Sequence, residues 1–202
     1  MIKCKIQQKA TELFINLGFK SVTMDDIAHE MGISKKTIYT HFSNKTALVK
    51  DCAYQALANI SAGIDKICAK KKNPIEELYE IKHFVSQQLK GEKSSPQFQL
   101  QKYYPAIYQS IREQQFERME ICVVENIKRG VTQGIYRENL NIDFISRIYF
   151  SGVQSIKDDT LFPVEKFNKQ ELVDAFLEYH LRGIVTPKGR ETLNKIINSN
   201  HE

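Results

Sequence analysis

The chain has 202 residues, of which 42% are hydrophobic, 26% charged and 10% aromatic, a composition typical of a folded globular protein. This composition excludes a collagen-like chain, a disordered segment and a small disulfide-stapled domain. The net charge of +5 is concentrated in residues 1–50, which hold eight Lys or Arg against four Asp or Glu. Gly32–Lys50 contains four lysines and no acid. Such a block is a candidate anion-binding surface, and an ordinary solvated surface is an equally open interpretation.

The sequence argues against a membrane protein, a secreted protein and a metal protein. Its longest uncharged stretch, Cys52–Ile64, has 13 residues, whereas a membrane-spanning helix needs about 20 apolar residues. The first residues lack the apolar core and cleavage site of a secretory signal, so we expect a cytoplasmic protein without membrane contacts. The four cysteines are widely spaced and form no C-x-x-C pair. They predict buried thiols rather than a metal site, and no cofactor is expected.

Helical periodicity predicts four helices in the first part of the chain, where strand-like alternation is rare. An apolar stripe indicates a first helix over 2–17, closed by Gly18. Thr23 and Asp26 form a predicted capping box before a second helix that ends at Gly32. A third helix is predicted over about 35–42 after Ser34, and a long fourth helix after Ser43 or Asn44.

Further helices are predicted near 74–90, 97–112, 114–131, 142–156, 169–185 and 188–198. Pro74 suits the first turn of a helix, and Pro105 should kink or split the segment that contains it. With nine to ten helices and no sheet, the predicted fold class is all-α.

The segment Thr23–Phe42, TMDDIAHEMGISKKTIYTHF, is predicted to form a helix, a glycine turn and a second helix. Many helical proteins contain such a pair, so further evidence is needed to assign a function. The predicted third and fourth helices start with Lys35, Lys36 and Lys45. A cation at a helix start is unfavourable by a few tenths of a kcal/mol to about 1 kcal/mol. A docked phosphate group would explain these lysines.

The exposed side of the predicted third helix is also unusual. On a helical wheel, Ile38 and Phe42 share the buried side. The remaining surface is free of acids and consists of basic, hydroxyl or polar aromatic side chains: Lys36, Thr37, Tyr39, Thr40 and His41. A surface selected for stability alone would favour Glu, Ala or Lys. This surface is suited to the major groove of DNA.

These residues resemble the N-terminal domain of the TetR family of bacterial transcriptional regulators. The matching stretch is ELFINLGFKSVTMDDIAHEMGISKKTIYTHFSNKTAL, with T-x-x-D-I-A, G-I-S-K, T-I-Y-x-H-F and N-K-x-x-L as its motifs. QGIYRENLN and HLRGIVTPKGR, later in the chain, resemble the family more loosely. The resemblance implies a three-helix DNA-binding domain with a helix-turn-helix (domain 1–48, motif 23–42). It also implies a larger helical domain for effector binding and dimerisation over 49–202.

The resemblance further implies a homodimeric regulator, expected to be a repressor, that binds a palindromic double-stranded operator. A small, mostly apolar effector of unknown identity would release it. The resemblance assigns phosphate contacts to Thr23 and Lys45, and contacts with the flanking backbone to Tyr39 and His41. It assigns contacts with base edges to Lys36, Thr37 and Thr40. The expected DNA-binding residues are Thr23, Lys35, Lys36, Thr37, Tyr39, Thr40, His41 and Lys45. Lys36 departs from the glycine or alanine of many members, so we expect it to add phosphate affinity rather than base specificity.

Two helices with wide apolar stripes, near 142–156 and 169–185, are predicted to form the dimer interface. Their candidate interface residues are Ile145, Ile148, Tyr149, Gly152, Ile156, Leu172, Val173, Phe176, Leu177, His180, Leu181 and Ile184. Residues 51–202 hold 16 of the 20 aromatic residues, and a helix broken at Pro105 favours an apolar pocket among them. Its candidate lining residues are Phe98, Tyr103, Tyr104, Tyr108 and Phe116, for which core packing is the alternative.

Two other functions were weighed against this interpretation. A ferritin-like metal enzyme needs two E-x-x-H pairs, and the sequence offers only Glu80–His83. Neither H-E-x-x-H nor G-x-G-x-x-G occurs, so we expect no enzymatic activity. A DNA-binding adaptor without a small-molecule effector is the other alternative, and the presence of an effector pocket distinguishes the two.

Overall fold

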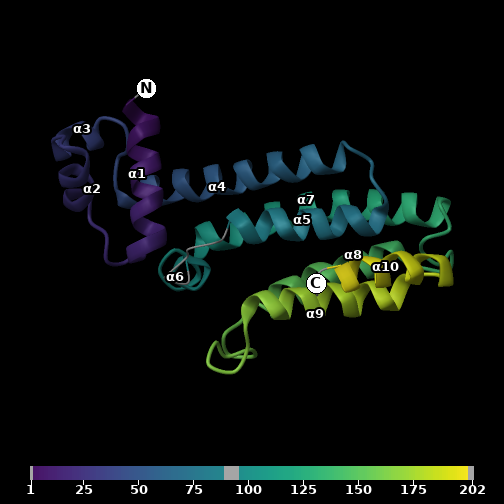
Figure 1. Ribbon diagram of the computed structural model, residues 1–202. Helices are drawn as coiled ribbons and strands as arrows, with labels where there is room; N and C mark the ends of the chain where they lie inside the picture. Colours follow the sequence, from purple (N-terminus) through teal and green to yellow (C-terminus); the bar gives the residue numbers. More distant parts are fainter. Residues whose placement is uncertain (1, 89–95, 200–202) are drawn as a thin grey trace. The chain divides into compact units, whose positions relative to one another are not determined.

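The computed structural model describes residues 2–88 and 96–199, and their contacts divide the chain into two compact units (Figure 1). Unit 1 spans residues 1–62 and 88–115, and unit 2 spans residues 63–87 and 116–202. The described residues form ten helices and, outside them, one isolated bridge between Tyr136 and Val185. The predicted all-α class is confirmed. By contacts, the chain divides differently from the expected 1–48 and 49–202.

Unit 1 contains helices from both halves of the sequence. They are α1 (Ile2–Leu17), α2 (Met24–Met31), α3 (Lys35–Tyr39), the first part of α4 (Lys45–Cys68), α6 (Pro96–Tyr103) and the first part of α7 (Pro105–Thr132). Phe14, Ile27 and Leu48 are at most 1% exposed in its core. Leu100 and Ile107 belong to the same core. The N-terminal helices therefore share one core with α6 and α7, and unit 1 extends well beyond residue 48.

Several predicted helix ends in unit 1 are confirmed by their hydrogen bonds or backbone geometry. The Asp26 backbone N–H donates to Thr23 Oγ1 at 3.1 Å, and the Thr23 N–H donates to Asp26 Oδ2 at 2.7 Å, which completes the capping box. Asn44 rather than Ser43 caps α4, because its Oδ1 accepts from the Ala47 N–H at 2.8 Å. Gly18 ends α1 with φ +87°, and a Cβ there would meet the Gln99 side chain at 2.4 Å. The positive φ thus favours glycine at residue 18, whereas the amide end of the flexible Gln99 side chain could move aside.

Two predicted helix boundaries are wrong. The third helix ends at Tyr39 rather than near residue 42, although the Phe42 N–H still donates to the Ile38 carbonyl at 3.0 Å. Pro105 splits the predicted 97–112 helix, as expected, into α6 and α7. No second break follows near residue 113, because REQQFERM contains neither glycine nor proline to end the helix.

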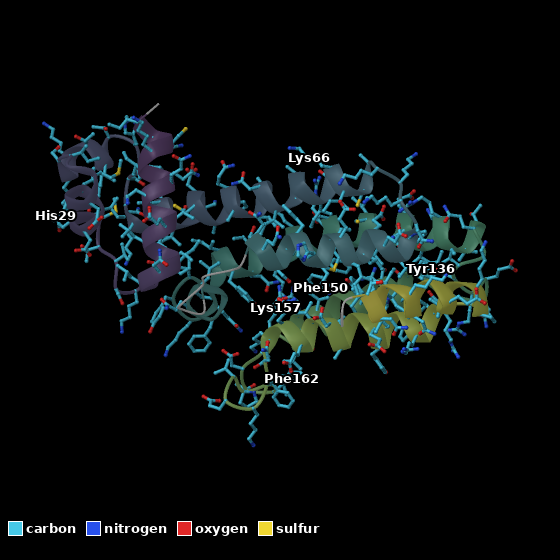
Figure 2. All side chains as sticks on the ribbon, in the orientation of Figure 1. His29, Lys66, Tyr136, Phe150, Lys157 and Phe162 are labelled. Atoms are coloured by element: carbon cyan, nitrogen blue, oxygen red, sulfur yellow. The ribbon has the colours of Figure 1, made fainter. Side chains whose placement is uncertain are left out.

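Unit 2 contains the whole of three helices, α8 (Ile142–Ser155), α9 (Lys169–Ile184) and α10 (Pro187–Ser199). It also contains the end of α4, the second part of α7, and α5 (Pro74–Gln88) except for its last residue. Figure 1 shows α8, α9 and α10 running alongside one another. Ile75, Leu181 and Leu193 are fully buried between these helices. Phe150, labelled in Figure 2, meets the ring of Phe116 edge-on with centroids 5.1 Å apart.

A buried chain of hydrogen bonds crosses unit 2 from Tyr136, which is labelled in Figure 2. The Tyr136 hydroxyl donates to Asn126 Oδ1 at 3.1 Å, and Asn126 Nδ2 donates to Glu77 Oε1 at 2.8 Å. Arg129 Nη2 donates to the same Glu77 oxygen at 2.5 Å. Glu77 Oε2 is buried and accepts no hydrogen bond from the described residues. Burial raises the pKa of the Tyr136 phenol, so the hydroxyl stays protonated and continues to donate.

We predict that Tyr136→Phe lowers the free energy of unfolding by about 1–2 kcal/mol, because the buried Asn126 Oδ1 then loses the donor at 3.1 Å. Urea denaturation followed by circular dichroism measures the loss. Tyr179→Phe is the matched control, since Tyr179 is 78% exposed and should change stability by less than about 0.5 kcal/mol. Equal losses in both variants would contradict the importance of the buried chain.

Candidate nucleic-acid interface

Helices α2 and α3 form a helix-turn-helix through a tight glycine turn. Gly32 has φ +62°, and its N–H and that of Ile33 donate back to the carbonyls of His29 and Ala28 at 3.1 and 3.0 Å. The Ser34 hydroxyl accepts from the Thr37 N–H at 3.1 Å and caps α3. These bonds fix where α3 begins and how it follows α2.

The rotation of α3 agrees with the predicted wheel. Ile38 is 0% exposed and Phe42 is 4% exposed. Lys36, Thr40 and His41 are exposed, Tyr39 is 44% exposed, and Thr37 is half-buried. The expected base-facing and backbone-facing side chains therefore share one accessible surface on unit 1. Their roles toward DNA remain predictions.

The two threonines of this surface are held by local hydrogen bonds. The Thr40 hydroxyl donates to the Thr37 carbonyl at 2.7 Å, and the Thr37 and Ser34 hydroxyl oxygens lie 2.9 Å apart. Each threonine keeps a methyl group, and the lone pairs of the Thr40 hydroxyl remain available as acceptors. Such groups suit the methyl of thymine and the amino groups of adenine or cytosine.

Several expected phosphate-binding groups are engaged within the chain. Lys35 Nζ lies 2.7 Å from Asp25 Oδ2, and this bond raises the pKa of the Lys35 ammonium. Lys45 Nζ donates to the Lys20 carbonyl at 3.3 Å, and partial burial lowers the pKa of Lys45. The side chain of Lys36 makes no ion pair or hydrogen bond within the part of the chain that the structure describes. Among the three expected lysines, Lys36 is therefore the one that can bind a ligand without giving up a partner.

Sequence reasoning missed one basic residue at this surface. Lys3 of α1 places its Nζ 5.3 Å from the centroid of the Phe42 ring, and 3.8 Å from Asp51 Oδ1. It therefore adds a cation beside the end of the helix-turn-helix. No local pattern could reveal it, because Lys3 and Phe42 lie far apart in sequence.

The residues expected at a dimer interface divide into two groups. Ile156, Leu177, His180, Leu181 and Ile184 are at most 8% exposed and pack inside unit 2. They are core residues of a single chain, and their contribution to a dimer interface stays a prediction. An apolar stripe cannot distinguish the side chains that meet the chain's own core from those that meet a second copy.

The other group lies nearer the surface of α8 and α9. Ile148 is 47% exposed, whereas Ile145, Tyr149, Gly152, Leu172, Val173 and Phe176 are partly buried. The Phe176 ring covers Gly152, where a Cβ would approach it to 2.2 Å. Phe144 and Tyr179, at 57% and 78% exposure, are the large exposed residues on these helices that sequence reasoning missed. They lie outside the core-facing stripe, so periodicity gave no signal for them.

The candidate pocket residues are distributed over both units. In unit 1, Tyr104 and Tyr108 pack against the core, whereas Phe98 and Tyr103 on α6 are exposed at 54% and 38%. Phe116 packs in unit 2 against Phe150. Their role in lining an effector pocket stays a prediction.

A small hollow in unit 2, too narrow for a water molecule, is lined by Leu78, Val123, Asn126, Ile127, Tyr149, His180 and Ile184. Among residues 2–88 and 96–199, no cluster of three or more His, Cys, Asp or Glu could hold a metal ion. None of the helices within those ranges is long and apolar enough to cross a membrane.

Comparison with known proteins assigns the helix-turn-helix to a family. The family described as bacterial regulatory proteins, tetR family, matches residues 6–52, from α1 into α4. Residues 6–52 are therefore similar to the N-terminal domain of TetR-family regulators. This stretch contains all the expected DNA-binding residues, from Thr23 to Lys45.

Proteins similar to this chain include a transcriptional activator and a transcriptional repressor. The transcriptional activator FasR of Mycolicibacterium smegmatis is 34% identical over 55 residues, which span 27% of this chain and 25% of FasR. The transcriptional repressor KstR2 of Mycobacterium tuberculosis is 24% identical over 151 residues, which span 71% of this chain and 73% of KstR2.

The likeness to known proteins covers most of the chain when structures are compared. SmeT, the repressor of a multidrug efflux pump of Stenotrophomonas maltophilia, superposes with a TM-score of 0.70. The superposition covers 92% of this chain and 91% of SmeT, at 15% sequence identity. At this identity the likeness shows the fold alone.

We predict that Asp26→Asn destabilises the protein at pH 7, because the capping box lowers the pKa of the Asp26 carboxyl. A carboxyl with a lowered folded pKa stabilises the fold above its unfolded pKa of about 3.9 and loses this contribution as the pH falls through the folded value. The difference in Tm between wild type and variant should therefore shrink below about pH 4. Glu30→Gln, an exposed control on the same helix, should show little difference at either pH. A pH-independent deficit for Asp26→Asn would contradict the electrostatic origin of the cap.

Proposed function

We propose that the protein is a homodimeric transcriptional regulator that represses genes by binding a palindromic operator and leaves it when a small, mostly apolar effector binds. The observation that carries this proposal is the exposed, acid-free surface of α3 on a TetR-family helix-turn-helix. KstR2, which is described as a repressor, supports repression over activation.

The accessible surface of α3 suits sequence recognition in the major groove. Thr37 and Thr40 offer small hydrogen-bonding side chains that read base edges. Lys36 and Lys3 supply charge for phosphates, and Tyr39 supplies a hydroxyl at the rim of the surface. Phosphate contacts set affinity and base contacts set specificity, so the two groups of residues should respond differently to substitution.

We predict that Lys36→Ala and Tyr39→Ala weaken binding to every DNA sequence, whereas Thr37→Ala and Thr40→Ala also relax the base preference at one position. Lys36→Ala should reduce the slope of log affinity against log salt by about 1. Selection of bound DNA from a random pool by the purified protein provides the operator, and fluorescence anisotropy then measures each variant.

Lys195→Ala is the matched control for the DNA-binding variants. It removes the same charge from an exposed position on α10 in unit 2 and should leave affinity unchanged. Unchanged affinity and base preference in all four α3 variants, with folding intact, would overturn the proposed interface.

A homodimer would present two such surfaces to a palindrome, with half-sites about 34–36 Å apart. We propose that α8 and α9 form the dimer interface through their exposed apolar side chains. Phe144 and Ile148 are four residues apart and lie on one side of α8, and Tyr179 is the most exposed large hydrophobic residue on α9. Exposed apolar side chains on neighbouring helices are typical of subunit contacts.

We predict that Ile148→Glu and Tyr179→Glu give folded monomers that lose operator binding, because a buried unpaired carboxylate is costly at a subunit contact. Light scattering measures the mass, and circular dichroism checks the helix content. Leu17→Glu is the control, since Leu17 of α1 is 58% exposed and apolar and lies outside the proposed interface. A folded Tyr179→Glu variant that stays dimeric would refute this surface.

The effector is proposed to bind in the helical part beyond the DNA-binding domain. The hollow in unit 2 combines apolar walls with three polar side chains, Asn126, Tyr149 and His180. Burial lowers the pKa of His180 to about 4, so its imidazole is neutral at pH 7 and suits an uncharged ligand. The hollow is too narrow for water, so an effector must open it, and that opening would shift the dimer toward a state with lower operator affinity.

We predict that a panel of hydrophobic metabolites and toxicants contains compounds that raise the Tm and release operator DNA. A compound at 100 times its Kd should stabilise the protein by about 2.7 kcal/mol. Tyr149→Phe tests the hollow, and Tyr108→Phe tests the aromatic set predicted from the sequence. The variant in which the compound no longer raises the Tm locates the binding site. If no compound in the panel changes the Tm, the result favours a DNA-binding adaptor without an effector.

A further inference from the structure

Two of the four free cysteines lie in contact inside unit 2. Cys68 is the last residue of α4, Cys122 lies in α7, and their Sγ atoms are 2.9 Å apart. Both residues are partly buried. The sequence predicts separate buried thiols, because the two cysteines are far apart along the chain, so the pair is visible only in the fold.

The end of α4 is fastened to α7 on both sides of this thiol pair. Asp65 accepts a hydrogen bond from Arg118 about one turn before Cys68. Just after α4, the Lys72 carbonyl accepts from Arg129 Nη1 at 3.1 Å. These contacts limit the separation of the two helices where the sulfur atoms meet. The proximity of the two sulfur atoms therefore follows from the packing of α4 on α7 as well as from the rotamers of the two cysteines.

We propose that Cys68 and Cys122 are a redox modification site at which a hydroperoxide generates an intramolecular disulfide. Cys68 first loses its thiol proton, and the thiolate attacks one oxygen of the hydroperoxide. The O–O bond breaks, Cys68 becomes a sulfenic acid, and the other oxygen takes up a proton and leaves as an alcohol or as water. The Cys122 sulfur then attacks the sulfenic sulfur, an S–S bond forms, and the hydroxyl leaves with a proton as water. Two thiols are oxidised and one peroxide is reduced.

The surroundings of the cysteine pair determine how fast each of these two steps is. Burial raises the pKa of both thiols, so little thiolate is present at neutral pH. The first step is therefore slow and responds to strong oxidation. The second step is fast, because the resolving sulfur is already in contact at 2.9 Å. Further oxidation of the sulfenic acid is thereby avoided.

The other two cysteines lack this arrangement. Cys4 is exposed, and no described cysteine lies beside it. Cys52 is buried, its thiol donates to the Gln7 carbonyl at 3.5 Å, and burial raises its pKa to about 11. They serve as internal controls for the proposed site.

The experiment uses the full chain with Cys4→Ser, which removes the exposed thiol and prevents cross-links between molecules. Hydrogen peroxide should lower the number of free thiols per chain by two. Mass spectrometry should then find the Cys68 peptide joined to the Cys122 peptide, and dithiothreitol should separate them. The disulfide should raise the Tm, because it closes a long loop. In a Cys122→Ser variant, dimedone should instead label Cys68 as a sulfenic acid.

Two results would overturn the site. One is oxidation of Cys68 to a sulfinic acid without a cross-link in the folded protein. The other is retention of both thiols under peroxide and diamide, while the same protein in urea reacts fully. Loss of the cross-link in Cys122→Ser and in Cys68→Ser, with retention in Cys52→Ser, would support it.

A separate measurement tests whether the disulfide regulates DNA binding, and this step rests on the proposed function. Helix α4 contributes residues to both units, so fixing its end should change operator affinity by about fivefold or more. The change should be absent in Cys122→Ser. Equal affinity of the reduced and oxidised forms would overturn the regulatory step, whereas the peptide cross-link tests the site independently of DNA.

Discussion

Burial of the Ile38 side chain is the constraint on which the proposed DNA-binding surface depends. Helix α3 has five residues, far fewer than the about 12–15 that an isolated helix needs to be marginally stable. Its Thr37 and Ile38 are β-branched and favour helices weakly. The helix is therefore held by Ile38, which is 0% exposed in the core of unit 1, and by the Ser34 cap. Because the same side chain fixes the rotation of α3, it also determines which residues face outward.

Polar groups around this surface already have partners within the chain. Thr23 belongs to the capping box, Lys35 pairs with Asp25, and Lys45 donates to the Lys20 carbonyl. Docking onto a phosphate backbone would therefore exchange one set of partners for another. Exposed ion pairs contribute at most about 1 kcal/mol, so this exchange costs little. These internal hydrogen bonds and the ion pair keep the side chains of Thr23, Lys35 and Lys45 ordered in the absence of a ligand.

Much of unit 1 could be predicted from the sequence because its signals are local. The capping residues Thr23 and Asn44 and the turn at Gly32 act within four residues of their own position, and Pro105 breaks the chain where it stands. Properties that depend on distant contacts could not be predicted in this way. The stripe on α9 contains Leu181, but periodicity alone does not tell whether it meets the chain's own core or a partner. Cys68 and Cys122 are paired only by the packing of α4 on α7.

The composition of unit 1 has a consequence for the construction of chimeric regulators. A graft that transfers residues 1–48 alone would leave behind Leu100, Ile107 and Ile111, which complete the core beneath the first helices. It would also separate Gly18 from Gln99, and Phe19 from Tyr104, whose ring lies edge-on at 6.2 Å. Exchange of DNA specificity is therefore better made by replacing only the outward side chains of α3, leaving Ile38 and the shared core in place.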